Sequence, residues 1–111
     1  MRVEFIDPGA LRHECGLEAA TLAPDGAGGH AESWAEIATV FARVEPVSAS
    51  SGFGADQSLE TVTHRVTVRH RADVASGMRL TRGGRILDIV TVHDPDESGR
   101  YLVLSARERV A

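Results

Sequence analysis

Apolar and polar side chains alternate with a period of two along several stretches of the chain, a period typical of half-buried β-strands. Residues 33–45 predict one such strand, and its two faces are Val40, Ala42 and Val44 against Phe41, Arg43 and Glu45. Residues 61–70 predict another, and its faces are Val62, His64, Val66, Val68 and His70 against Thr63, Arg65, Thr67 and Arg69.

Turn signals separate these strands from further ones. The alternation of Leu11, His13, Cys15 and Leu17 predicts a strand over residues 11–23, and the Pro, Asp and Gly residues of 24–29 predict a hairpin turn after it. We expect Trp34 and Ile37 to anchor the beginning of the next strand. Residues 78–80 and 85–93 flank Gly83-Gly84 and predict a second β-hairpin with a largely buried second strand. The acidic turn 94–99 leads to a last strand over residues 100–107.

This pattern predicts a mainly β fold: a small antiparallel β-barrel or sandwich of five to six strands. Residues 46–58 are rich in Ser, Gly and Ala without a sustained period, so they predict a long loop or a short helix after the second strand. The breaker Asp7-Pro8-Gly9 marks residues 1–10 as an N-terminal arm. Residues 11–111 then form one domain, as the length of 111 residues allows.

Composition narrows the functional class. The chain is 42% hydrophobic, with only five aromatic residues, so the core comes mainly from Val, Leu, Ile and Ala. All 12 basic residues are Arg and the net charge is −4, which disfavours a dedicated nucleic-acid binder. No apolar segment approaches the roughly 20 residues that span a bilayer, and residues 1–10 lack the features of a signal peptide. We expect a protein made in the cytosol that contacts no membrane.

Candidate chemistry is sparse. Cys15 is the only cysteine, which excludes an internal disulfide and a cysteine-rich zinc site. A buried structural thiol is a better interpretation than a nucleophile activated by His13 or His64. His64 and His70 share a strand face but lie roughly 20 Å apart, too far to hold one metal ion.

Two further motifs have ordinary interpretations. Asp94, Asp96 and Glu97 lack the ligand pattern of a calcium loop, which favours an exposed acidic turn. Gly52-Phe53-Gly54 lacks the third glycine and the strand-to-helix context of a dinucleotide site. The sequence therefore predicts no catalytic, cofactor-binding or metal site, and no enzyme.

Arginines cluster in the second half of the chain. Arg65, Arg69 and Arg71, with Arg79, Arg82 and Arg85, predict a basic stripe on one sheet face. Such a stripe is either a solvated face or a surface that binds acidic patches on adjacent subunits, and the sequence leaves both open.

Several short motifs occur in an order that resembles a known family. They are Leu11-Arg12-His13, Gly28-Gly29 before Trp34, the strand from Ala38 to Pro46, the strand from Thr63 to Arg69, the segment from Gly77 to Ile89, and Leu102-Val103-Leu104. Their joint order and spacing resemble the head-tail joining (head-closure, or stopper) proteins of long-tailed bacteriophages and gene transfer agents.

The resemblance implies a barrel-like protomer in a ring of six or twelve copies at the neck of a phage-like particle, assembled in the host cytoplasm. Such a ring lies between a portal-adaptor protein and a tail terminator or tail tube protein. It closes the DNA-filled head, lines the channel through which double-stranded DNA passes without sequence-specific binding, and docks the tail. No cofactor is implied.

Within this interpretation, two residue sets are candidates for function. The loop 47–58 is a channel or gating loop by its length and glycine content, with the candidates Ser48, Ser50, Ser51, Gly52, Phe53 and Gly54. The subunit-contact candidates are Arg65, Arg69, Arg71, Arg82 and Arg85. The alternative is an OB-like or SH3-like β-barrel that binds nucleic acid or peptide as a monomer, and steep weakening by salt would mark nucleic-acid binding.

Overall fold

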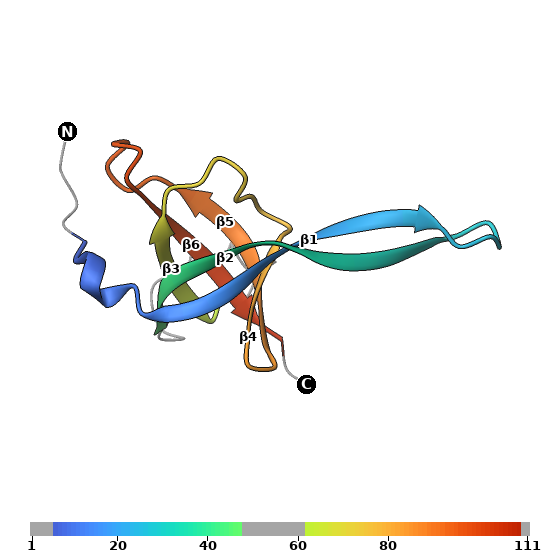
Figure 1. The fold of residues 1–111 in the computed structure, drawn as a ribbon, viewed down its shortest axis with the longest axis horizontal. Coiled ribbons are helices and arrows are strands. Elements are labelled where there is room, and N and C mark those ends of the chain that lie inside the picture. Colours follow the sequence, from blue (N-terminus) through green and yellow to red (C-terminus); the bar gives the residue numbers. More distant parts are fainter. Residues whose placement is uncertain (1–5, 48–61, 110–111) are drawn as a thin grey trace, which may run out of the picture.

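The computed structural model describes residues 6–47 and 62–109, which form six β-strands and one short 3-10 helix (Figure 1). In chain order these are η1 (Pro8–Ala10), β1 (His13–Pro24), β2 (His30–Pro46), β3 (His64–Arg69), β4 (Arg79–Arg82), β5 (Arg85–His93) and β6 (Tyr101–Glu108). The predicted mainly β class is confirmed. Each predicted strand is present, with ends within a few residues of the predicted ones.

The six strands form one antiparallel sheet that closes on itself in the order β1-β2-β3-β6-β5-β4. The ring closes where Gly16–Glu18 of β1 pair with Arg79–Thr81 of β4. All other neighbours along the ring are also antiparallel. For β1 and β2, and for β4 and β5, this is the arrangement that a short turn between consecutive strands permits. Within the described residues, the body of the protein is therefore a ring of strands around an apolar interior.

Alternate side chains of each strand fill that interior, as the period of two predicts. Leu17, Leu80 and Leu104 are the largest side chains that are almost fully buried. Val66 and Val68 of β3 and Ala42 of β2 pack beside them. The core is thus aliphatic, in agreement with the small number of aromatic residues.

The tight turn between β4 and β5 has a clear local cause. Arg82 and Arg85 are paired across the hairpin, so only Gly83 and Gly84 form the loop. Both glycines have positive φ, 54° and 87°, the conformation that a two-residue turn of this kind requires and that other residues adopt at a cost. The predicted hairpin at this dipeptide is confirmed.

One detail of the predicted strands is wrong, and one strand is covered more completely than its pattern indicates. Thr67 alternates with Val66 and Val68, as predicted, and its exposed fraction is only 5%, so both faces of β3 are covered at this point. Ile37 was expected to anchor the beginning of β2, yet it is 44% exposed. The predicted loop 46–58 lies outside the described residues except for Pro46, which ends β2, and Val47.

The breaker near the N-terminus forms η1. The side chain of Asp7 accepts a hydrogen bond from the backbone N–H of Gly9 at 2.9 Å, which caps the helix. Leu11, which follows, is buried. Residues 1–5 of the predicted N-terminal arm lie outside the described residues.

Candidate functional site

The most distinctive feature of the molecule is the far half of the β1–β2 hairpin, which leaves the ring as a two-stranded ribbon (Figure 1). We call residues 18–36 the hairpin arm. Every residue from Ala20 to Ser33 is exposed. A two-stranded ribbon without a third strand or a covered face is marginally stable in water. The hairpin arm therefore depends on contacts at its root or with a partner.

A β-bulge marks the point where the hairpin arm begins. Leu17 is opposite Ala38, but the next residue, Glu18, is opposite Glu36, so Ile37 is an extra residue on β2. A bulge of this kind bends a strand and increases its twist. The bulge thus gives a local reason for the hairpin arm to turn away from the ring.

The two faces of the hairpin arm differ in character. One face carries only small side chains, namely Ala19, Thr21, Ala23, Ala31, Ser33 and Ala35, and the hydroxyls of Thr21 and Ser33 lie 2.9 Å apart. The other face carries larger side chains and carboxylates, namely Glu18, Ala20, Leu22, Pro24, His30, Glu32, Trp34 and Glu36. We call this second face the acidic face. It includes Leu22, an apolar side chain that is 67% exposed.

The tip of the hairpin arm is organised by Asp25. Its carboxylate accepts hydrogen bonds from the backbone N–H groups of Ala27 and Gly29 at 2.8 and 3.1 Å. These bonds lower the pKa of Asp25, because they favour the charged form of the carboxyl group. The turn that the sequence predicts at residues 24–29 is therefore present and held by local hydrogen bonds.

Side chains fix the root of the hairpin arm to the ring. The guanidinium of Arg79 on β4 lies 4.1 Å from the centre of the Trp34 ring and donates a hydrogen bond to Glu18 at 2.7 Å. The Arg79 and Glu18 side chains are only 15% and 19% exposed, so solvent screens this ion pair less than a surface pair. Trp34 also donates from Nε1 to Glu32 at 3.1 Å.

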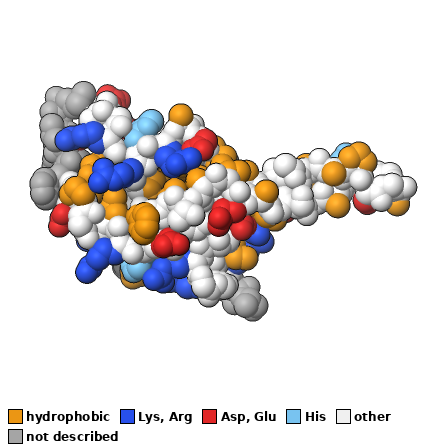
Figure 2. All heavy atoms as spheres, in the orientation of Figure 1, with side chains coloured by type: hydrophobic (Ala, Val, Ile, Leu, Met, Phe, Trp, Pro, Cys, Tyr) orange, Lys and Arg blue, Asp and Glu red, His pale blue; other side chains and the backbone are white. Residues whose placement is uncertain are grey.

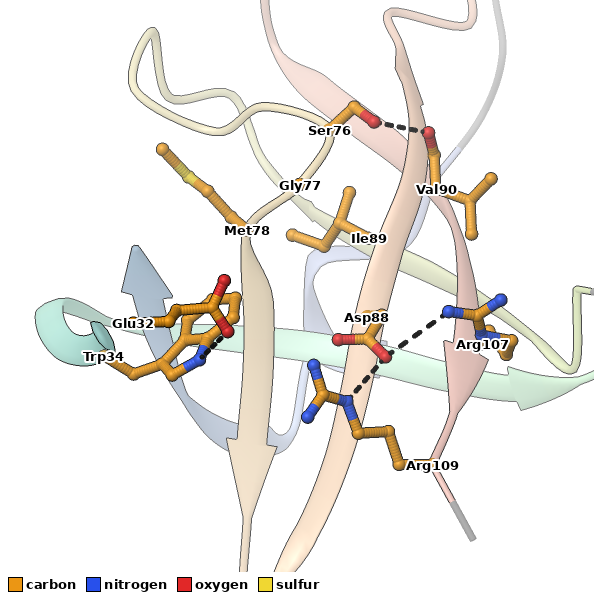
Figure 3. Close-up of a pocket in the computed structure, with 10 residues that line it drawn as sticks. All are labelled: Glu32, Trp34, Ser76, Gly77, Met78, Asp88, Ile89, Val90, Arg107 and Arg109. Atoms are coloured by element: carbon orange, nitrogen blue, oxygen red, sulfur yellow. Dashed lines mark hydrogen bonds and ion pairs between the residues drawn. The ribbon is translucent and has the colours of Figure 1, made fainter. Parts of the chain in front are cut away.

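A shallow pocket of about 330 Å³ lies at this root, between β2, β5 and the end of β6 (Figure 3). Trp34 and Glu32 border one side of it. On the other side, Asp88 accepts a hydrogen bond from Arg109 at 2.8 Å and has Arg107 at 3.8 Å. The bond to Asp88 raises the pKa of Arg109. Asp88 and the two arginines therefore neutralise one another in part at this side of the pocket.

The predicted subunit-contact arginines occupy different environments. Arg71 is paired with Asp73 at 2.9 Å, and Arg85 donates to Glu108 at 2.8 Å. Within residues 6–47 and 62–109, Arg65, Arg69 and Arg82 are exposed and have no ion-pair partner. Their role in subunit contact stays a prediction.

The predicted single basic stripe is divided by the topology. Arg65 and Arg69 project from β3, whereas Arg79, Arg82 and Arg85 belong to β4 and β5, and β6 lies between these two groups of strands. The gating-loop candidates Ser48, Ser50, Ser51, Gly52, Phe53 and Gly54 lie outside the described residues.

Cys15 occupies the environment expected of a structural thiol. It is 1% exposed, and burial raises the pKa of the thiol. Its sulfur lies 3.6 Å from the backbone oxygen of His13, so the described contact is with the main chain and not with an imidazole. This arrangement favours a neutral, packed thiol.

The acidic turn between β5 and β6 is internally satisfied. Asp94 accepts a hydrogen bond from the backbone N–H of Gly99 at 2.7 Å, and Asp96 pairs with Arg100 at 3.1 Å. In the part of the chain that the structure describes, no three His, Cys, Asp or Glu side chains come together in a way that could hold a metal ion. In the same part, no helix is long and apolar enough to cross a membrane.

Sequence reasoning missed the hairpin arm and its root. A signal for it exists: on both sides of the turn 24–29 the alternating residues are Ala, Ser, Thr and Glu, with few of the large aliphatic side chains that other strands carry. A strand without an apolar face does not pack on a hydrophobic core, so both of its faces are expected to stay exposed. The contact between Trp34 and Arg79 joins residues that are distant in sequence, so no local pattern in the sequence indicates it.

The structure thus defines a small, mainly β protein whose strands close in a ring and whose longest hairpin extends beyond that ring. The sequence profile of the phage head completion protein family matches residues 6–109. The chain belongs to the phage head completion protein family. The resemblance to phage head-tail proteins is thereby confirmed, and the chain is a structural component of the head-tail region of a phage-like particle.

Two solved structures are similar to this chain. A chain in the virion of a native gene transfer agent particle is 34% identical, with a TM-score of 0.67, and the match covers 91% of this chain and 97% of that one. Protein SF1141 from Shigella flexneri 2a, a solution structure, is 26% identical with a TM-score of 0.72, over 93% and 96% of the two chains. A search of curated proteins finds no match.

Proposed function

We propose that this protein forms a ring at the neck of the particle, between a portal-adaptor protein and a tail terminator or tail tube protein. The ring closes the DNA-filled head, surrounds the channel through which double-stranded DNA passes, and offers a docking surface for the tail. Six or twelve copies form it, and the protein acts through its geometry, without catalysis or a cofactor. It assembles in the host cytoplasm and contacts no membrane.

The observation that carries the proposal is the hairpin arm, held at its root by Trp34 and Arg79 while residues 20–33 are exposed. A preorganised arm loses little conformational entropy when a partner covers it, so it favours tight assembly. Family membership and the similar chain in a gene transfer agent virion support a particle as the place of that assembly.

Electron microscopy of purified particles, with this chain located in the density, tests the proposal. We expect a ring of copies at the neck, with the DNA channel along its axis. Density for this chain elsewhere in the particle, or its absence from purified particles, would overturn the proposal. The second outcome would favour a monomeric binding module, whose binding of a nucleic acid would weaken steeply with added salt.

A further inference from the structure

We propose that the acidic face of the hairpin arm of one copy docks on a basic patch at the opposite end of the β1–β2 hairpin in a second copy. The basic patch lies on the outer face of the closed sheet and contains four exposed arginines and an exposed aromatic, namely Arg12, Arg43, Arg65, Arg69 and Phe41. The four arginines outnumber two carboxylates on the same face, Glu14 opposite Phe41 and Glu45 paired with Arg43 at 3.1 Å. This contact would join neighbouring copies in the proposed ring at the neck of the particle, so the inference rests on the proposed function.

Strand register places the members of the basic patch beside one another. Arg43 on β2 is opposite Thr67 on β3, which lies between Arg65 and Arg69. Their neighbours Ala42, Val66 and Val68 face the interior, so these arginines face outward. Arg12 directly precedes His13, which begins β1 and is opposite Ala42, so Arg12 lies at the same end of the β1–β2 hairpin as Arg43.

The hairpin arm is complementary to this patch in charge. Residues 18–36 contain no arginine, and besides Glu18, which is already paired with Arg79 at the root, they contain Asp25, Glu32 and Glu36. On the face that Figure 2 shows, basic and acidic side chains both lie on the body of the molecule, and no basic side chain lies along the hairpin arm. Electrostatic complementarity of this kind selects partners and fixes their register.

Apolar contact reinforces the charge pattern. Leu22 on the acidic face is 67% exposed, and Phe41 in the basic patch is 54% exposed. Together with Ile37 they are the large hydrophobic side chains that the described residues leave most open to water. Burial of Leu22 against Phe41 of a neighbour would remove apolar surface from water on both copies.

The same charges disfavour pairing between two hairpin arms. The free strand edges of the described residues lie mainly on the hairpin arm, because β3 pairs only with Ala42–Pro46 of β2 and β4 only with Gly16–Glu18 of β1. Edge-to-edge pairing of two arms would bring carboxylates of like charge together. Docking on the arginine-rich end of a second copy avoids this repulsion.

The geometry makes the contact head-to-tail. The hairpin arm is one end of the β1–β2 hairpin, and the basic patch contains the opposite end, where β1 begins and β2 ends (Figure 1). A copy therefore cannot place its own arm on its own patch. A contact between two different surfaces repeats from copy to copy and closes into a ring when the rotation permits.

Charge reversal on each surface tests this contact, with sedimentation velocity of the purified full chain as the measurement. The arm variant combines Glu32→Arg with Glu36→Arg, and the patch variant combines Arg12→Glu with Arg69→Glu. We expect the wild-type chain to form oligomers and each variant to self-associate at least roughly tenfold more weakly. An equimolar mixture of the two variants restores charge complementarity at every contact, so it should form oligomers larger than dimers.

Other outcomes overturn the inference: a monomeric wild-type chain, variants that assemble like the wild type, or a mixture that stops at dimers, as pairing between arms would give. Glu97→Arg, in the turn between β5 and β6, is the control for a charge reversal outside both surfaces. Thermal unfolding shows whether each variant is folded. If the arm variant is not folded, Glu36→Gln replaces it, and if the patch variant is not folded, Arg69→Gln replaces it. Location of the wild-type chain in particles tests the proposed function separately.

Discussion

The guanidinium of Arg79 lies over the indole ring of Trp34, 4.1 Å from its centre, and this contact joins the hairpin arm to the ring of strands. Arg79 also donates to Glu18, so one side chain of β4 contacts both strands of the hairpin arm. A cation over an aromatic ring contributes about 0.5–1 kcal/mol at exposed sites and roughly 2 kcal/mol when desolvated. The direction of the hairpin arm is therefore set by side chains at its root as well as by the bulge.

Replacement of the tryptophan, Trp34→Ala, should loosen the hairpin arm while the ring stays folded. We expect faster amide hydrogen exchange over residues 19–35, and a loss of global stability of about 1–2 kcal/mol. Hydrogen exchange followed by mass spectrometry measures the first effect, and chemical denaturation measures the second. Leu22→Ala, farther out on the same face, is the control. Unchanged exchange in the hairpin arm would show that its root does not depend on Trp34.

Replacement of a core leucine, Leu17→Ala, should lower the free energy of unfolding far more than Trp34→Ala does. Leu17 is fully buried at the point where β1 pairs with both β2 and β4, and loss of its side chain leaves a cavity there. Such substitutions cost about 2–5 kcal/mol in the free energy of unfolding. Urea denaturation measures this, with Leu22→Ala on the same strand expected within about 0.5 kcal/mol of wild type. Similar values for the two variants would mean that the ring does not close around Leu17.

Replacement of a turn glycine, Gly84→Ala, should destabilise the β4–β5 hairpin. Gly84 has a φ of 87°, and a side chain in the left-handed region costs roughly 1–2 kcal/mol. No other atom lies within 4 Å of a Cβ added there, so the loss would come from backbone conformation alone. Gly84→Asn is the matched comparison, because Asn tolerates positive φ better than Ala does. Equal stability of the Ala and Asn variants would contradict this account.

The local part of the fold follows directly from the sequence. Alternation such as Val66 and Val68 against Arg65 and Arg69 identifies a strand and its buried face, because successive side chains of a strand point to opposite sides. Turn chemistry identifies the connections, as Gly83-Gly84 does for β4 and β5. Both signals depend on residues that are adjacent in the chain, and for this reason every strand was predictable.

The candidate site was not predictable in the same way, because it depends on which strands become neighbours. The pairing of β1 with β4 brings Glu18 against Arg79, and no periodicity indicates that pairing. The exposure of the hairpin arm follows from the absence of a third strand beside it among the described residues, which alternation alone does not reveal. Thr67 illustrates the same limit, since its burial arises from tertiary packing and not from its position on β3.

Acid should weaken the contact between β5 and β6 at the Arg85–Glu108 pair. Arg85 donates to both carboxylate oxygens of Glu108, at 2.8 and 3.2 Å, and this lowers the pKa of Glu108 below its ordinary value of 4.5. A carboxyl group whose pKa is lower in the folded state stabilises the fold above its unfolded pKa, and this contribution is lost as the pH falls through the folded value. The wild-type protein should therefore lose part of its extra stability relative to Glu108→Gln as the pH falls below about 4.5.

Thermal unfolding from pH 7 down to the acid range, for wild type and Glu108→Gln together, measures this difference. The Arg85 guanidinium stays charged throughout, because its hydrogen bond to Glu108 raises its already high pKa, so only the carboxylate titrates in this pair. Glu97→Gln, a change of the same type on an exposed turn, is the control. A difference between wild type and Glu108→Gln that is constant with pH would mean that the pair contributes nothing to folding. A difference that shrinks on acidification, without a matching change in the control, would assign the effect to the contacts of the Glu108 carboxylate, which are the two hydrogen bonds from Arg85 and the His64 imidazole at 3.9 Å.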